Sequence, residues 1–303
     1  MFLTLVVLAL VAYAIQGVLV GQLARRFDLP WVVTVRGLSL LVLMAPLTLW
    51  MADGSWAAVP GHLPWLALAC VGALLANLAQ TYAIRHLPMA IAQAASQGLS
   101  ALFTLALAGV VFGEIPRPVE IACVAGILAC VGALGWISGR DTPRAPEARP
   151  LRGLLACVGF AVCMAGALVP LGMVSREVDP FFAAWAWEGG IGVAGLVLVA
   201  GRAAALRGAA PTIPWDAVWR VALCSSPTLI GTGAYTYATT IGNLFVAGGV
   251  LAMMMVVTGV LAWFLYGERL RRAEWAWIGA TCACLIALAT TQVWPLIKAL
   301  LHP

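Results

Sequence analysis

The chain has 303 residues, of which 63% are hydrophobic and 10% are charged, and its formal net charge is +5 at pH 7. Soluble domains are about 45–50% apolar and about 25% charged, so this composition excludes a water-soluble globular domain and indicates an integral membrane protein. Apolar stretches of about 20 residues, the length that spans a hydrocarbon core about 30 Å thick, recur along the whole sequence. Because they are continuously apolar and do not alternate, they predict helices and exclude strands as spans.

We predict an all-α integral membrane protein with ten transmembrane helices. In chain order, the predicted helices cover residues 2–22, 31–51, 63–84, 88–112, 119–136, 153–174, 181–201, 217–238, 243–266 and 275–294. The first could also be a secretory signal, since Ala12-Tyr13-Ala14 has the small-x-small form of a cleavage site. No basic residue precedes its apolar run, which continues beyond Ala14, so we expect this helix to remain.

Arg36 lies well inside the second predicted helix, about six residues beyond Pro30, at a depth of roughly 9 Å. An ionised side chain at a helix centre costs roughly 2.5–3.5 kcal/mol, so it usually faces a wet cavity, a partner or a ligand. We therefore predict that Arg36 binds substrate. Two other interpretations stay open: Arg36 snorkels to the headgroups, or it belongs to a purely structural ion pair.

Polar side chains gather on the third and fourth predicted helices. Gln93 and Gln97 lie on one helical face with Ser100 and Thr104, because these residues are four, three and four positions apart. Asn77 and Gln80 form a shorter cluster with Thr81. Such groups either line an aqueous pathway or bond to neighbouring helices. We predict that Asn77, Gln80, Gln93 and Gln97 contact substrate.

Residues 111–134 return 154 positions later as residues 265–288, with no gap needed. The unit is far longer than a solenoid motif, so the chain is interpreted as a duplicated half-protein. A polar segment separates five predicted helices from five, which predicts a first repeat at 1–138, a linker at 139–150 and a second repeat at 151–303. Because five is odd, the second repeat enters the membrane from the opposite side, and a central cavity is expected between the inverted halves.

The seventh predicted helix holds Glu188, the only one of twelve acidic residues well inside a predicted helix. It lies about eight residues beyond Pro180, roughly 12 Å deep from the opposite face to Arg36. We predict that Glu188 binds substrate and is the candidate for proton coupling; a permanently protonated Glu188 or a structural pair are the alternatives. Trp185 precedes it and is a further predicted substrate contact, since an indole stacks on rings and quaternary amines.

The eighth predicted helix contains Pro227 among several hydroxyl residues, and Tyr235 follows two turns later. Proline removes a backbone hydrogen bond, so Pro227 is the predicted kink and gate or hinge, with a purely structural kink as the alternative. The ninth predicted helix offers Met253 within a methionine run, a soft wall for varied ligands or a packing surface. Tyr235 and Met253 complete the predicted substrate contacts.

Basic residues indicate the orientation, because cytoplasmic loops carry an excess of Lys and Arg. Thirteen of the 17 lie on the side of the loop between the first and second predicted helices, and only three lie on the other side. This count predicts that both termini are extracytoplasmic.

The eight cysteines all fall inside predicted helices, where their simplest role is apolar packing, and the three histidines are too scattered for a metal site. We expect no cofactor, no metal and no nucleic-acid partner. No Ser/His/Asp or metal arrangement lies at a common depth, so we expect no enzymatic activity.

The motifs that end the third and fourth predicted helices of each half resemble those of the drug/metabolite transporter superfamily, specifically EamA-type ten-helix transporters. They are Tyr82-Ala83 with Gly113-Glu114, and Tyr237-Ala238 with Gly267-Glu268. The resemblance implies alternating access around a central site and outward movement of metabolites or toxic compounds. Characterised ten-helix members usually keep both termini in the cytoplasm, against the count of basic residues.

Arg36 also lies where many EamA-type second helices carry an arginine. The short four-helix multidrug relatives use a glutamate in their first helix, but this chain has Ala14, Gln16 and Gly17 in that region. The resemblance therefore implies no proton coupling through that position, and Glu188 is a positional substitute only.

We predict a secondary transporter that exports small polar or amphipathic metabolites across the bacterial inner membrane, with lipids and protons as further partners. An amino-acid-like substrate would satisfy both intramembrane charges. The alternatives are a multidrug, quaternary-amine or lipid translocator of the same fold, and a non-transporting membrane scaffold. Neither the substrate's identity nor the oligomeric state follows from the sequence.

Overall fold

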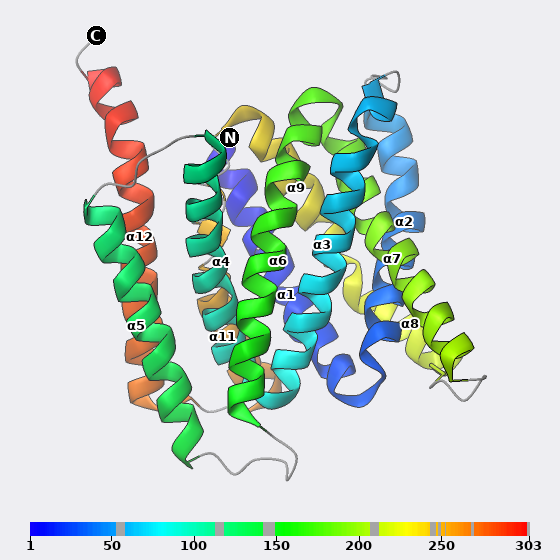
Figure 1. Ribbon diagram of the computed structural model, residues 1–303, viewed down its shortest axis with the longest axis horizontal. Helices are drawn as coiled ribbons and strands as arrows, with labels where there is room; N and C mark the ends of the chain where they lie inside the picture. Colours follow the sequence, from blue (N-terminus) through cyan, green and yellow to red (C-terminus); the bar gives the residue numbers. More distant parts are fainter. Residues whose placement is uncertain are drawn as a thin grey trace.

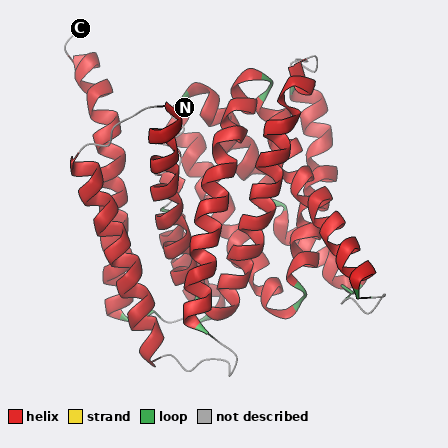
Figure 2. Cartoon of the chain, in the orientation of Figure 1, coloured by secondary structure: helices red, strands yellow, loops and turns green. Residues whose placement is uncertain are grey.

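A computed structural model of the chain describes residues 1–52, 58–112, 118–141, 149–206, 212–242, 247, 250–251, 253–267 and 270–301. Every regular element within these ranges is a helix (Figure 2). The first half comprises α1 (Phe2–Arg26), α2 (Leu29–Met51), α3 (Val59–His86), α4 (Met89–Phe112) and α5 (Pro118–Asp141). The second comprises α6 (Pro150–Glu177), α7 (Pro180–Ala205), α8 (Trp215–Ser225), α9 (Pro227–Ile241), α11 (Met254–Tyr266) and α12 (Arg272–Leu301).

The predicted fold class is confirmed: these helices form ten spans in two five-helix halves. The eighth span consists of α8 followed by α9, and α11 is part of the ninth. Five helices, α1, α2, α3, α6 and α7, are each long and apolar enough to cross a membrane in the part of the chain that is described. The motif residues Gly113, Glu114 and Glu268, and the residues 142–148 of the predicted linker, lie outside the described residues.

The two halves run in opposite directions. In Figure 1, α1 begins and α12 ends at the top of the molecule, whereas α5 ends and α6 begins at the bottom. Several helices also extend beyond their predicted ends; α5, for example, continues to Asp141, inside the predicted linker. Hydropathy detects only the part of a helix that lies in hydrocarbon, and the backbone hydrogen bonds continue through the polar residues beyond it.

The sequence places proline at the start of several helices. Pro30, Pro150, Pro180 and Pro227 each occupy the first or second position, where the missing N–H has no intrahelical partner to lose. The side chain of Asp179 caps α7 by accepting bonds from the backbone N–H groups of the next turn. Pro30, Pro150 and Pro180 therefore begin helices where the chain turns back into the bilayer, whereas Pro227 begins a helix within a span.

The halves meet most closely where α2 packs against α7 and α3 against α6. At the α2–α7 crossing the backbones of Gly37 and Gly192 touch, because a Cβ on either glycine would overlap the other's main chain. Small residues permit this approach between membrane helices, where association depends on van der Waals packing. The crossing holds Arg36 of α2 and Glu188 of α7 at the interface between the halves.

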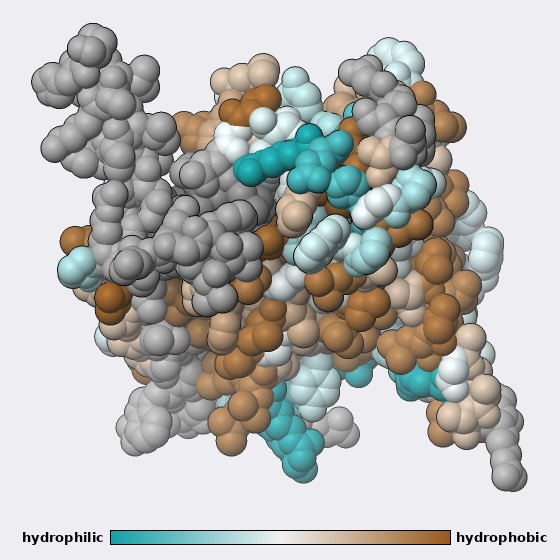
Figure 3. Space-filling view, turned by 45° about the horizontal axis from the view of Figure 1, so that its top comes forward, coloured by the Kyte–Doolittle hydropathy of each residue, from teal (hydrophilic) through white to brown (hydrophobic). Residues whose placement is uncertain are grey.

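Apolar side chains remain on the outside of the bundle. Hydrophobic residues cover the middle of the visible face, and hydrophilic residues gather toward its upper and lower edges (Figure 3). Large exposed apolar residues include Val42, Leu68, Val197 and Phe264. A surface of this kind suits lipid and not water, in agreement with a multi-pass membrane protein.

The eighth span is broken at its predicted kink. α8 ends at Ser225 and α9 begins at Pro227, with Ser226 between them. The hydroxyls of Ser225 and Ser226 donate to the carbonyls of Val221 and Leu223, so the polar groups near the break are partly satisfied by side chains. A hinge or gate at Pro227 stays a prediction.

Candidate functional site

A cavity of about 130 Å³ lies between the two halves. Its walls come from α1, α2, α3 and α4 of the first half and from α6, α7, α9 and the start of α11 of the second, together with Leu251. Arg36 is its single cationic lining residue and Glu188 its single anionic one among those described. The two predicted intramembrane charges therefore face the same space.

Arg36 and Glu188 form a buried ion pair. Nη2 of Arg36 donates to both carboxylate oxygens of Glu188, at 3.2 Å to Oε1 and 2.9 Å to Oε2. The two residues are only 5% and 1% exposed, so Arg36 does not snorkel to the membrane surface. A buried pair keeps both charges compensated, whereas removal of one partner leaves the other exposed to the low dielectric.

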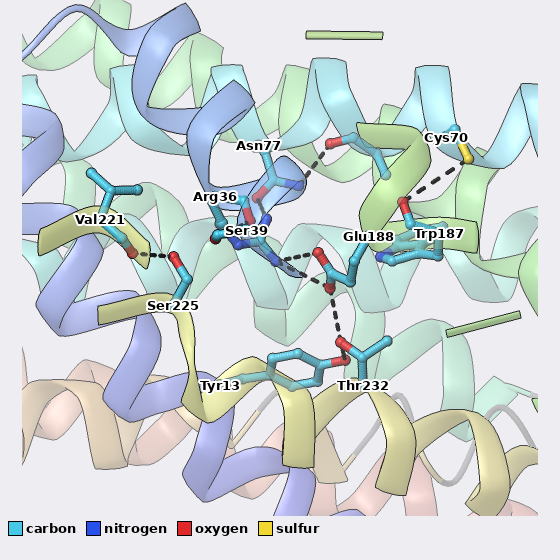
Figure 4. Close-up of polar contacts among 11 residues, drawn as sticks. Tyr13, Arg36, Ser39, Cys70, Asn77, Trp187, Glu188, Val221, Ser225 and Thr232 are labelled. Carbon is cyan, nitrogen blue, oxygen red and sulfur yellow. Dashed lines mark hydrogen bonds and ion pairs between the residues drawn. The ribbon is translucent and has the colours of Figure 1, made fainter. Parts of the chain in front are cut away.

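Neighbouring side chains hold each member of the pair (Figure 4). Nη1 of Arg36 donates to Oδ1 of Asn77 at 2.7 Å, and Nδ2 of Asn77 donates to the carbonyl of Ala73. On the other side, the hydroxyl of Thr232 donates to Oε1 of Glu188 at 2.8 Å. The site thus joins α2, α3, α7 and α9, two helices from each half.

The hydroxyl of Tyr13 on α1 extends this network by donating to Thr232 Oγ1 at 3.0 Å. Tyr13, Thr232 and Glu188 therefore form a continuous chain of hydrogen bonds from the first helix to the buried carboxylate. Glu188 thereby contacts both halves, through Arg36 directly and through Thr232 to Tyr13.

Carboxamides line another part of the cavity. Nε2 of Gln80 donates to Oε1 of Gln93 at 2.9 Å, which joins α3 to α4. Gln97 and Gln16 also line the cavity, and the apolar residues Phe160, Met164, Leu168 and Leu171 of α6 line it as well. The cavity is consequently neutral overall, with a carboxamide-rich part and an apolar wall, which suits a small amphipathic molecule.

Seven of the nine predicted substrate contacts line this cavity: Arg36, Asn77, Gln80, Gln93, Gln97, Glu188 and Tyr235. Trp185 and Met253 do not line it. Trp187, two residues after Trp185, and Met254, the residue after Met253, line the cavity instead. Nε1 of Trp185 donates to the carbonyl of Leu41, on the side of α7 that packs against α2. Each residue turns a helix by about 100°, so the neighbours of a correctly placed residue face elsewhere.

Tyr13, Gln16 and Thr232 were not predicted as contacts, although they line the cavity or bond to the ion pair. Tyr13 and Gln16 are three positions apart on an otherwise apolar helix, and that spacing was a usable signal. Thr232 was one of many hydroxyl residues in its span, with nothing in the sequence to single it out.

Two arginines at equivalent positions of the two halves bond to the end of a neighbouring helix. Nε of Arg25, at the end of α1, donates to the carbonyl of Ile84 near the end of α3. In the second half, Nε of Arg176, at the end of α6, donates to the carbonyl of Thr239 near the end of α9. Each therefore ties the first helix of its half to the third, on opposite sides of the membrane.

Comparison with known proteins supports both the fold and the duplication. The model of the EamA-like transporter family matches residues 1–137 and 151–291. A solved structure, titled only as a crystal structure of a protein, is 17% identical and has a TM-score of 0.58, covering 98% of this chain and 99% of that chain. At that identity the likeness concerns the fold alone. Among curated proteins, none matches this sequence.

Proposed function

The chain belongs to the EamA-like transporter family, and on that premise we propose that it is a secondary transporter of small amphipathic zwitterions, molecules that resemble amino acids. The observation that carries this proposal is the buried Arg36–Glu188 pair, which lines a cavity shared by the two inverted halves. A guanidinium and a carboxylate side by side match the two charges of such a substrate.

The substrate replaces the pair's own interaction. Its carboxylate bonds to Arg36 and its ammonium to Glu188, so neither protein charge is left buried and uncompensated. A ligand with a single charge that separates the pair leaves one of them without a partner, at a cost of about 3–5 kcal/mol. The apolar residues of α6 receive the substrate's hydrocarbon part.

The proposed transport cycle is alternating access, in which the two halves rock against each other. Arg36 and Glu188 lie on α2 and α7, one in each half, so this movement acts on the pair. Exchange between the protein pair and the substrate pair thus couples binding to the movement of the halves. We propose export as the direction, as the family resemblance implies.

Protons are the proposed coupling ion, with Glu188 as the group that takes them up. The hydrogen-bonded chain from Tyr13 through Thr232 reaches Oε1 of Glu188 and offers a route for a proton. A protonated Glu188 no longer attracts the substrate's ammonium, so proton uptake and substrate binding compete for the same carboxylate.

The proposal is tested by flux into proteoliposomes. A thermal-shift screen on the purified protein, covering amino acids, polyamines, nucleosides and quaternary amines, first selects the substrate. Arg36→Ala and Glu188→Gln are then expected to abolish its transport while the proteins still express and purify as single species. Arg220→Ala is the control, because Arg220 is 63% exposed in a surface pair with Asp216 and lies outside the cavity.

Unaltered flux in both cavity variants would remove the site from the mechanism. If uphill movement continues after the pH gradient is collapsed, protons are not the coupling ion. Selection of polyamines or quaternary amines by the screen would instead favour a multidrug translocator.

A further inference from the structure

Most hydrogen-bond acceptors around the ion pair already have donors. Both carboxylate oxygens of Glu188 accept from Arg36, and Oε1 also accepts from Thr232. Oδ1 of Asn77 accepts from Arg36, and Oε1 of Gln93 accepts from Gln80. A group that approaches as a donor or a cation therefore has to displace an existing bond.

Two polar groups in the same cavity are in the opposite situation. Nε of Arg36 and the hydroxyl of Tyr235 are buried and have no hydrogen-bond partner within the described part of the chain. Both residues line the cavity, and Tyr235 is only 3% exposed. The guanidinium Nε–H is solely a donor, and the phenolic hydroxyl donates readily, so both of these buried groups lack an acceptor.

We infer that the substrate's carboxylate binds first, by accepting hydrogen bonds from Nε of Arg36 and the Tyr235 hydroxyl. The Arg36–Glu188 pair is still intact at this stage. This inference rests on the proposed transport function and adds an order and a further specificity residue. A carboxylate supplies several lone pairs and forms charge-assisted bonds with a guanidinium. A molecule that carries only a cation finds both carboxylate oxygens of Glu188 already bonded to donors.

Tyr235 has a distinct part in this scheme. It lies on α9, three residues after Thr232, so the two hydroxyls project from the same side of that helix. Thr232 bonds to Glu188, whereas the hydroxyl of Tyr235 is buried and bonds to nothing described. Burying a polar group without a partner costs stability, and a carboxylate bound in the cavity would supply the partner that Tyr235 lacks.

The experiment compares three molecules that share one apolar tail. Leucine carries both charges, 4-methylpentanoate lacks the amino group, and 3-methylbutylamine lacks the carboxylate. Their binding to purified protein in lipid nanodiscs is measured by calorimetry. Wild-type protein is expected to bind leucine and 4-methylpentanoate, and to bind 3-methylbutylamine at least tenfold more weakly than 4-methylpentanoate.

Tyr235→Phe removes one hydroxyl and preserves the ring. It is expected to weaken binding of both carboxylates about tenfold or more, and to leave the melting temperature of the empty protein unchanged or higher, because an unpaired buried hydroxyl is lost. Tyr237→Phe is the matched control on the same helix, since Tyr237 stacks on Phe181 and lies outside the cavity lining. Tyr13→Phe should lower the melting temperature, because the bond from Tyr13 to Thr232 is lost.

The inference is overturned if 3-methylbutylamine binds as well as 4-methylpentanoate, if none of the three molecules binds, or if Tyr235→Phe leaves carboxylate binding unchanged. A fall in melting temperature for Tyr235→Phe equal to that for Tyr13→Phe would assign Tyr235 a structural role instead. Failure of the proposed function differs from all of these: carboxylates would bind, and Tyr235→Phe would weaken them, yet no flux would occur.

Discussion

At the scale of single residues, the two lone charges were recognisable because each is isolated in an apolar helix. Hydropathy cannot tell a snorkelling arginine from a paired one, so three interpretations of Arg36 remained open. The contact of Arg36 Nη2 with Glu188 removes snorkelling, because the guanidinium is turned inward and held by Asn77. Whether the pair is purely structural is decided by experiment on its energetics and on flux.

A double-mutant cycle separates these roles. Arg36→Met leaves Glu188 buried without a counterion and is expected to destabilise the protein by about 3–5 kcal/mol, as should Glu188→Leu. The double variant should be far more stable than the two single effects predict, because an apolar pair replaces the ion pair. Thermal unfolding in detergent measures the coupling, and strictly additive effects would show that the two charges do not interact.

None of the three variants should transport substrate if the pair is functional. A double variant that regains both stability and flux would identify the pair as structural, and Tyr235 and the carboxamides would then have to account for binding. Stability and flux measured together therefore show whether the Arg36–Glu188 pair is structural or takes part in transport.

At the scale of helices, the α2–α7 crossing positions the site. Gly37 follows Arg36 directly, and Gly192 lies one turn beyond Glu188, so the residues that touch are neighbours of the residues that pair. Small-residue positions are visible in the sequence, but α7 contains several glycines and the sequence does not say which one faces α2. The structure shows the tightest backbone contact at Gly192, where a Cβ would overlap the backbone nitrogen of Leu38.

A single methyl group tests the crossing. Gly37→Ala places a Cβ against the backbone of Gly192, which cannot move aside as a flexible side chain can, so the variant is expected to lower the melting temperature and flux severely. Gly166→Ala on α6 is the control, since nothing lies within 4 Å of its Cβ position. Alanine there should be neutral or stabilising by up to about 1 kcal/mol. Equal behaviour of the two variants would contradict the close crossing.

At the scale of the whole molecule, the inverted repeat leaves the orientation in the membrane to the charge distribution. By the predicted topology, thirteen of the 17 basic residues fall on the side of the loop between the first and second predicted helices, among them Arg25, Arg85 and Arg202. Cytoplasmic loops carry such an excess, which predicts that both chain ends are extracytoplasmic.

Reporter fusions measure that orientation directly. An alkaline phosphatase fused after Pro303, which folds only outside the cytoplasm, is expected to be active, while a fusion within the loop between α5 and α6 is expected to be inactive. The reverse result would place both termini in the cytoplasm, as in the characterised family members. The Arg36–Glu188 site would be unaffected by that result, because it lies between the two halves.

The membrane class, the ten spans, the duplication and the two buried charges followed from the sequence alone. Apolar length, a direct repeat and isolated ionisable residues are one-dimensional signals, and each has a local physical cause. Seven of the nine predicted contacts also line the cavity, because polar side chains are unfavourable against lipid and turn toward the interior of the bundle.

Only the tertiary structure decided which partners those residues have. The pairing of Arg36 with Glu188 joins positions 152 residues apart, and it depends on the angle at which α2 and α7 cross. Each residue turns a helix by about 100°, and hydropathy does not record this rotation. The rotation decides that Trp187 and not Trp185 lines the cavity. It also brings Tyr13 and Thr232 into the hydrogen-bond network. Helix identity is local, whereas the direction a side chain faces is set by the helices packed around it.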